Sequence, residues 1–263
     1  MKTNFGLIAV TITLLSASLA GCMGDEDSSG EYSGPIDLIV YYDSTSGMIE
    51  TSENNGQTGP TTGVELSFDF ADTTSDDGSI TKIMIEPDDG SSPVEGDPAD
   101  NAVISYTWMT HGVFTVTLTA EDSDGNSHSI MVKVKIDMHI VWSDTNTATA
   151  SMTFDATPDC EDGDPLPDRI TISSTVENPG QLFGGNSDVA WSLNNPSEEE
   201  IASNSGTLGN GASETWDYTS RDIVEGFWSL DVEVTNGDNV NVNNDVTIAY
   251  AEGAEDATNP RTE

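Results

Sequence analysis

Three pairs of aspartates are the residues of this chain whose type and spacing best suit a metal ion. Each pair stands in a segment rich in turn-forming residues, and the pairs are Asp76 with Asp77, Asp88 with Asp89, and Asp122 with Asp124. Ca²⁺ takes several oxygen ligands, and loop carboxylates supply them in many proteins. If these loops gather at one end of a β-sandwich, they form a weak calcium site that stiffens the domain. The alternative is that Asp is there because it is a good turn former.

Residues 122–126, with the sequence Asp-Ser-Asp-Gly-Asn, begin like the calcium loop of an EF-hand. The last position of that loop needs a bidentate Glu, and Lys133 stands there in this chain. A lysine ammonium has no lone pair to offer a cation, so the full motif is excluded. The acidic loop 159–164 is a second, separate calcium candidate.

The residue types used in catalysis are present only in scattered positions. His111 and His128 fall in expected turns, and His139 falls in an expected strand. The chain has no Gly-x-Ser-x-Gly nucleophile elbow, no His-Glu-x-x-His zinc motif and no glycine-rich phosphate loop. The sequence therefore predicts a protein that is not an enzyme and that needs no cofactor, apart from the weak Ca²⁺ considered above.

Two of the five tryptophans are candidates for a ligand surface. An aromatic residue inside a short alternating strand usually belongs to a core, and we expect most of the five to be buried. Trp142 and Trp216 are flanked by polar residues, so they are the ones expected at the surface, where an indole ring can stack on a sugar.

The charge of the chain excludes one class of partner. Seven basic residues stand against 47 acidic ones, which gives a formal net charge of −40. Nucleic-acid binding depends on Lys and Arg that displace counterions from phosphates, so no nucleic acid is expected as a partner. An anionic membrane surface would also repel the chain. The acidity fits a solvating surface suited to a salty medium, with calcium binding as the alternative.

The first 22 residues resemble the signal peptide of a lipoprotein. Lys2 precedes an apolar stretch over residues 7–19, and residues 19–22 read Leu-Ala-Gly-Cys, which resembles a lipobox. That stretch is shorter than the roughly 20 residues of a membrane-spanning helix. The resemblance implies that residues 1–21 are removed and that Cys22 carries a lipid. The protein would then be extracytoplasmic and anchored to the membrane by lipid, and Cys160 would be the only thiol of the mature chain.

The residues after Cys22 divide by composition into a spacer, strand-rich regions and a tail. Residues 22–35 are acidic and polar, which predicts a flexible spacer. From residue 36 onward, apolar residues recur with period two, typical of β-strands. Residues 113–120 and 129–136 alternate on either side of the turn at 122–126, which predicts a hairpin. Residues 251–263 are polar and are expected to be a disordered tail.

Residues 64–136 resemble a polycystic kidney disease (PKD) domain, an immunoglobulin-like β-sandwich of extracellular proteins. The matching pieces are Phe68-Asp69, residues 75–80, residues 89–91, Tyr106 and residues 112–126. One departure is at residues 85–89, Ile-Glu-Pro-Asp-Asp, where the family has Trp-Asp-Phe-Gly-Asp. Ile85 can still fill a core position, although it is smaller than Trp. Residues 36–42 are expected to add a first strand, so the PKD-like domain is predicted over 36–136.

Residues 137–250 are similar to the CARDB domain, a cell-adhesion-related module with an immunoglobulin-like fold. The resemblance rests on residues 176–180, 208–211, 226–232 and 243–244. Strands are expected over 138–142, 148–154, 168–177, 187–193, 200–207, 213–218, 227–235 and 240–249. The fold class predicted for the whole chain is therefore all-β, with two immunoglobulin-like sandwiches in tandem.

These observations together predict a non-catalytic lipoprotein of the cell surface. Its domains would bind a protein or a polysaccharide outside the cell. The alternatives are an accessory subunit of an extracellular hydrolase or transporter, and a calcium-stabilised adhesion module.

Overall fold

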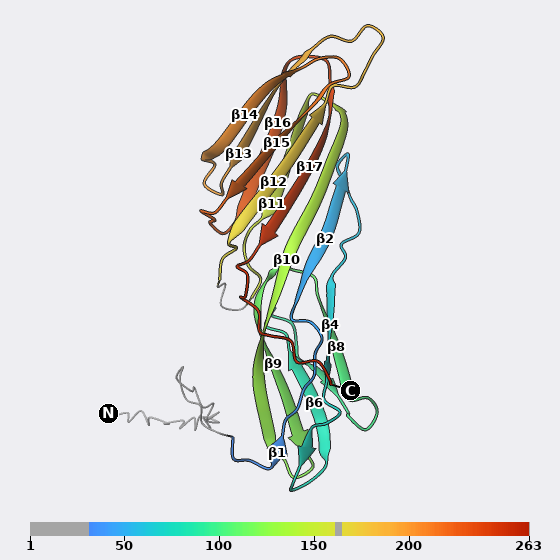
Figure 1. Ribbon diagram of the computed structural model, residues 1–263, viewed down its shortest axis with the longest axis vertical. Helices are drawn as coiled ribbons and strands as arrows, with labels where there is room; N and C mark the ends of the chain where they lie inside the picture. Colours follow the sequence, from blue (N-terminus) through green and yellow to red (C-terminus); the bar gives the residue numbers. More distant parts are fainter. Residues whose placement is uncertain (1–31, 161–164, 263) are drawn as a thin grey trace, which may run out of the picture. The chain divides into compact units, whose positions relative to one another are not determined.

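The fold is described from a computed structural model, which covers residues 32–160 and 165–262. This part of the chain is all-β, so the predicted fold class of immunoglobulin-like sandwiches is confirmed (Figure 1). The strands are β1 (Ile36–Asp37), β2 (Ser46–Asn54), β3 (Gln57–Thr58), β4 (Val64–Asp69), β5 (Thr74–Ser75), β6 (Ile80–Glu86), β7 (Val94–Gly96), β8 (Val103–Trp108), β9 (Gly112–Asp122), β10 (Ser127–Thr147), β11 (Thr149–Asp155), β12 (Arg169–Glu177), β13 (Ser187–Asn194), β14 (Glu200–Leu208), β15 (Ser213–Ser220), β16 (Phe227–Gly237) and β17 (Val240–Ala249). Across the described residues we find no helix of the length and apolarity needed to cross a membrane.

The first sandwich is organised around the predicted hairpin, which is confirmed as β9 and β10. Val116 pairs with Val132 and Phe114 with Val134, so the apolar side chains of both strands share one face. β6 and β7 extend this sheet beside β9, while β4 pairs with β8 in a separate sheet. Ile85 is fully buried in the core between them, as expected for the position where the PKD family has Trp.

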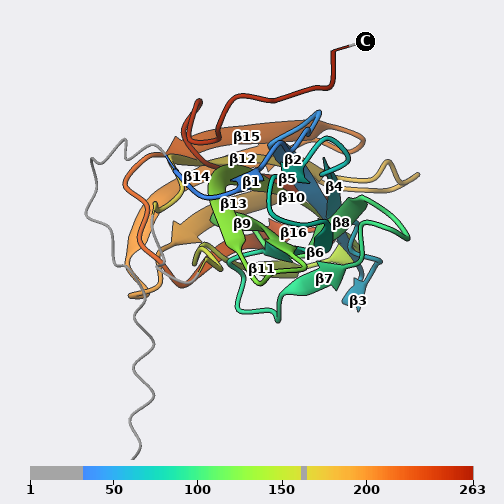
Figure 2. The same cartoon turned by 90° about the horizontal axis from the view of Figure 1, so that it is seen from below.

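The second sandwich consists of two antiparallel sheets with an added parallel strand. One sheet has the order β15-β12-β17-β10-β2, and the other has the order β14-β13-β16-β11. Figure 2 looks along the strands and shows the first of these sheets above the second. Trp191 and Trp228 are buried in the cores between the sheets. The seven strands expected from residue 148 onward are present as β11 to β17, and the strand expected over 138–142 is part of β10.

Strand β10 belongs to both sandwiches. Its first half pairs with β9, and its second half pairs with β17 on one side and with β2 on the other. The predicted division between residues 136 and 137 therefore falls inside one continuous strand. The alternating pattern does not break at Asp137, so the backbone has no local reason to turn there.

Strand β2 is the element that the sequence pattern does not reveal. It pairs in parallel with residues 135–143 of β10, and among its residues only Ile49 is buried. One buried apolar residue is too weak a signal for a strand. In the expected strand over 36–42, only Ile36–Asp37 is a regular strand, and isolated bridges follow at Tyr41 and Tyr42.

The C-terminal segment contradicts the expectation of a disordered tail. Residues 251–262 lie against the first sandwich, where Asn259 and Tyr42 exchange two backbone hydrogen bonds of 2.9 and 3.1 Å. Asp256 binds both backbone groups of Lys133, and Arg261 forms ion pairs with Asp69 and Asp72. Backbone pairing and opposite charges hold this segment, which explains why its polar composition is misleading.

Candidate functional site

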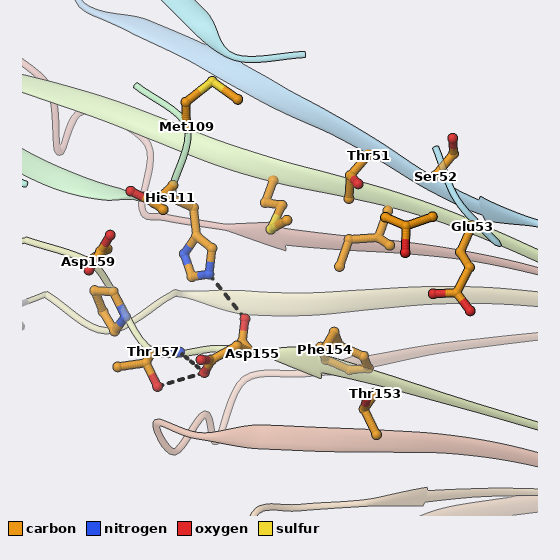
Figure 3. A pocket seen from close by; sticks show the side chains of 15 residues that line it. Thr51, Ser52, Glu53, Met109, His111, Thr153, Phe154, Asp155, Thr157 and Asp159 are labelled. Atoms are coloured by element: carbon orange, nitrogen blue, oxygen red, sulfur yellow. Dashed lines mark hydrogen bonds between the residues drawn. The ribbon is translucent and has the colours of Figure 1, made fainter. Parts of the chain in front are cut away.

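A cavity of about 460 Å³ lies where β2, the β8–β9 loop, β10 and β11 meet (Figure 3). Met138, Ile140 and Phe154 supply apolar surface, and the charged side chains along it are Glu53, Asp155 and Asp159. No Lys or Arg is among the residues that line it.

The register of the strands explains how these residues meet. Met138, Ile140 and Trp142 alternate along β10, so they point to the same face, toward the opposite sheet. The parallel pairing places Thr51 beside Ile140 and Glu53 beside Trp142. Figure 3 shows β2 on one side of the cavity and Thr153, Phe154 and Asp155 of β11 on the other.

A second cavity of about 110 Å³ continues along the same strands. Glu53, Ile140 and Thr153 line both cavities, and Trp142, Met152 and Ser151 complete the second. We call the two together the lateral groove. It runs between β2 and β11 along the open side of the second sandwich.

His111 is a buried member of the larger cavity, and both of its ring nitrogens are engaged. Nε2 lies 3.1 Å from the carbonyl oxygen of Asp155, and Nδ1 lies 2.8 Å from the Tyr250 hydroxyl. A carbonyl only accepts, so Nε2 carries the proton and Nδ1 accepts from Tyr250. Burial holds the pKa of His111 below its usual range, which keeps the ring neutral.

The two groups behind His111, Tyr250 and Asp137, are buried or half-buried. Burial raises the pKa of the Tyr250 hydroxyl, and it also raises the pKa of Asp137, whose carboxylate accepts the Tyr250 backbone N–H at 2.9 Å. The Asp159 N–H donates to the carbonyl of His111 at 3.1 Å. These contacts fix the β8–β9 loop against β11 and the end of β17. His111 thus acts as a structural tie, because both of its ring nitrogens are bound within the protein.

The predicted calcium ligands are partly used by the protein itself. Asp122 accepts hydrogen bonds from the N–H groups of Asp124 and Asn126, the Asn126 amide and the Ser75 hydroxyl. These bonds, led by that of the Asn126 side chain, lower its pKa to about 2. Asp122 therefore closes the β9–β10 turn with its own carboxylate.

The six aspartates lie at opposite ends of strand β6. Asp76 and Asp77 precede β6, beside the turn of Asp122 and Asp124, where the Ser123 N–H binds the Ser79 carbonyl at 2.9 Å. Asp88 follows β6 and accepts the Thr115 N–H, and Asp89 accepts the Tyr106 hydroxyl. Within residues 32–160 and 165–262, no three His, Cys, Asp or Glu side chains are placed to hold a metal ion. The six do not form one site.

The two tryptophans expected at the surface are not exposed there. Trp142 is 8% exposed and belongs to the second core, because its ring packs among Met152 and Ile140 in the lateral groove. Trp216 is half-buried beside Tyr218, with ring centroids 5.8 Å apart. Polar neighbours along an alternating strand lie on its other face, so they do not report the environment of the ring itself.

Several predicted features lie outside the described residues. They are the signal peptide, Cys22, most of the spacer and residues 161–164 of the second acidic loop. Cys160, at the start of that loop, is buried and packs against the first core.

Comparison with known proteins identifies one domain. Residues 51–136 match the family described as PKD domain, so the expected PKD-like domain is confirmed. No curated protein matches the chain in sequence.

Three of the solved structures that are similar to this chain match it at low identity. One comes from a study of carbohydrate-binding modules of the β-sandwich superfamily, with 16% identity over 83% of this chain and 98% of that one, and a TM-score of 0.29. The PKD1 domain of Vibrio anguillarum Epp has 17% identity over 37% of this chain and 94% of its own, with a TM-score of 0.22. The fibronectin(III)-like modules of Clostridium thermocellum CbhA have 12% identity over 73% and 91%, with a TM-score of 0.25.

Proposed function

We propose that this protein is a non-catalytic binding module of the cell surface, held outside the membrane by a lipid on Cys22. The PKD-like domain at residues 51–136 supports a role in display and adhesion. The second sandwich, which we propose to be a CARDB-like domain, contributes most of the ligand site. In this proposal, residues 22–35 separate the domains from the membrane.

The lateral groove is the observation that carries the binding role. Apolar side chains make its floor, and acidic side chains mark its border. Ligand sites typically combine such an apolar surface with a few placed polar groups. His111, the group in the cavity best suited to proton transfer, uses both of its nitrogens internally. Binding is therefore a better account of the groove than catalysis.

Two experiments on intact cells test this proposal. Mass spectrometry of the N-terminal peptide is expected to find a lipid on Cys22, and Cys22→Ser is expected to release the protein into the medium. For the ligand site, a photoreactive amino acid is placed at Thr157, an exposed residue that lines the groove, or at Thr219 on β15 as the control. The proposal requires a crosslinked partner from Thr157 and none from Thr219. Equal labelling from both positions, or none from either, would contradict it.

A further inference from the structure

We propose that the lateral groove accepts an extended polypeptide strand from a partner protein, which pairs with the free edge of β11. The partner segment alternates apolar side chains with Lys or Arg. This inference rests on the proposed binding function and names the class of ligand.

The two sheets of the second sandwich end unequally on the side of the groove. β10 lies across from β11, since Trp142, Met152 and Phe154 pack in one cluster. β2 extends the upper sheet beyond β10, whereas β11 is the last strand of the lower sheet. The lower sheet therefore has no counterpart to β2. The outer side of β2 is itself covered, because residues 57–62 hydrogen-bond to it at Glu50 and Ser52.

The hydrogen-bond pattern shows which groups of β11 face the vacant side. Ala156 donates to Gly226, and Ala148 accepts from Val234, so the even-numbered residues of β11 bind β16. In an antiparallel ladder the alternate residues point their N–H and C=O groups the other way. Those residues are Thr149, Ser151, Thr153 and Asp155.

The two ends of this edge are closed, and its middle is open. Thr149 exchanges hydrogen bonds with the Thr147 hydroxyl, and the Asp155 carbonyl is bound by His111. Ser151 and Thr153 have no such partner in the described part of the chain, and both line the groove. A strand entering the groove can therefore pair with two consecutive outward-facing residues.

Trp142 supplies a second, independent sign of a missing ligand group. Its indole N–H is buried and has no hydrogen-bond partner among the described residues, although most buried donors in proteins have one. Trp142 lines the same end of the groove as Ser151 and Thr153. A backbone or side-chain oxygen of an added strand would satisfy this donor.

Charge decides the kind of strand. Glu53, Asp155 and Asp159 line the groove, no Lys or Arg does, and the chain carries a net charge of −40. A second copy of the chain would be repelled, whereas Lys or Arg on the partner would be attracted. The groove exposes no aromatic face for a sugar ring, because Phe154 and Trp142 are 3% and 8% exposed. A basic, alternating polypeptide is the ligand that fits.

The test is a selection of displayed random peptides of about nine residues, roughly 30 Å when extended, on the intact protein. Selected peptides are expected to alternate apolar and basic residues. Thr153→Pro removes an outward N–H that β16 does not use, so the fold should be preserved. We expect Thr153→Pro to lower the affinity for the selected peptides by about tenfold or more. Thr219→Pro is the matched control, because Thr219 is an exposed threonine whose N–H faces outward on a different edge strand, β15.

Two further measurements separate strand pairing from simple attraction to an acidic protein. N-methylation of every second peptide bond keeps every charge and removes backbone donors. Two such peptides can be made, one methylated at the odd and one at the even positions, and the one that loses the N–H groups facing β11 should no longer bind. Trp142→Phe keeps an aromatic side chain but removes the indole N–H, and a loss of about two- to tenfold in affinity for the peptide is expected.

Three results would overturn the strand proposal. They are selected peptides that bind Thr153→Pro as tightly as the native protein, peptides that tolerate N-methylation in both registers, and a selection without alternating basic sequences. If the crosslinked partner from intact cells is retained by Thr153→Pro, the binding function stands and strand pairing in the groove is wrong. If neither peptides nor cells yield a partner, both proposals fail.

Discussion

Trp142 on β10 stands directly beside Glu53 on β2 in a parallel ladder. The first residue comes from the sequence expected to form the second domain, and the second comes from the sequence expected to form the first. This pairing makes the two sandwiches interdependent, because β2 joins the sheet of the sandwich that follows it. It also builds the groove, since both residues line its smaller cavity.

We expect the two halves to fail as separate proteins. Residues 36–136 alone leave β2 without the second half of its partner strand, and residues 137–250 alone lack β2 and expose the apolar face of β10. Thermal unfolding followed by circular dichroism should show a lower melting temperature or a broader transition for both fragments than for residues 36–262, which are the control. Two fragments that unfold cooperatively at the temperatures of the intact protein would contradict the shared architecture.

The C-terminal segment should contribute to stability. Removing residues 252–263 breaks two backbone hydrogen bonds between Asn259 and Tyr42 and two between Asp256 and Lys133, one of which the Asp256 carboxylate accepts. At about 0.5–1.5 kcal/mol for each of these four hydrogen bonds, we expect a loss of about 2–6 kcal/mol in the free energy of unfolding, measured with denaturant. Arg261→Ala is the comparison, because partly exposed ion pairs contribute below about 1 kcal/mol. A truncated protein as stable as the native one would show that the segment is not held.

His111 should make stability fall on mild acidification. Its pKa is lowered in the folded protein, so the unfolded chain takes up the proton first as the pH drops below about 6.5. The free energy of unfolding of the native protein should therefore decrease relative to His111→Gln between pH 7 and lower pH. The carboxylates are common to both proteins, so their titration cancels in the difference. A difference that does not change with pH would mean that His111 is not buried as described.

Calcium should have no specific effect on the described domains. Asp122 is saturated by internal hydrogen bonds, and Asp88 and Asp89 lie at the other end of β6 from Asp76 and Asp77. We expect equal melting temperatures in CaCl₂ and in MgCl₂ of the same concentration, since both salts screen the negative charge alike. A melting temperature that is higher in CaCl₂ than in MgCl₂, with the difference lost in Asp122→Asn, would instead support a calcium site.

The sequence predicts the fold where local signals are strong. The β9–β10 hairpin alternates cleanly and has a turn of Asp and Gly residues, so its strands and its buried face can be predicted. The seven strands β11 to β17 alternate with segments of turn residues and can be predicted in the same way. β2 could not be predicted, because Ile49 is its only buried residue and its partner strand is distant in sequence.

The groove escapes sequence analysis for the same reason. Glu53, Met109, Ile140 and Thr153 come from four separate segments, and only the strand register brings them together. Aspartates adjacent in sequence look like ligands, yet the Asp122 carboxylate closes its own turn and the Asp88 carboxylate accepts the Thr115 N–H. Trp142 lines the groove, but it is buried, and its role in ligand binding stays a prediction.

The most direct test of a groove that binds a strand is amide hydrogen exchange at Ser151 and Thr153, measured with and without a selected peptide. These two outward-facing amides are open at the edge of β11 in the structure. The account predicts that exchange at both slows on binding, while Thr215 and Thr219 on the opposite edge stay unchanged. Unchanged exchange at Ser151 and Thr153, with peptide bound, would contradict it.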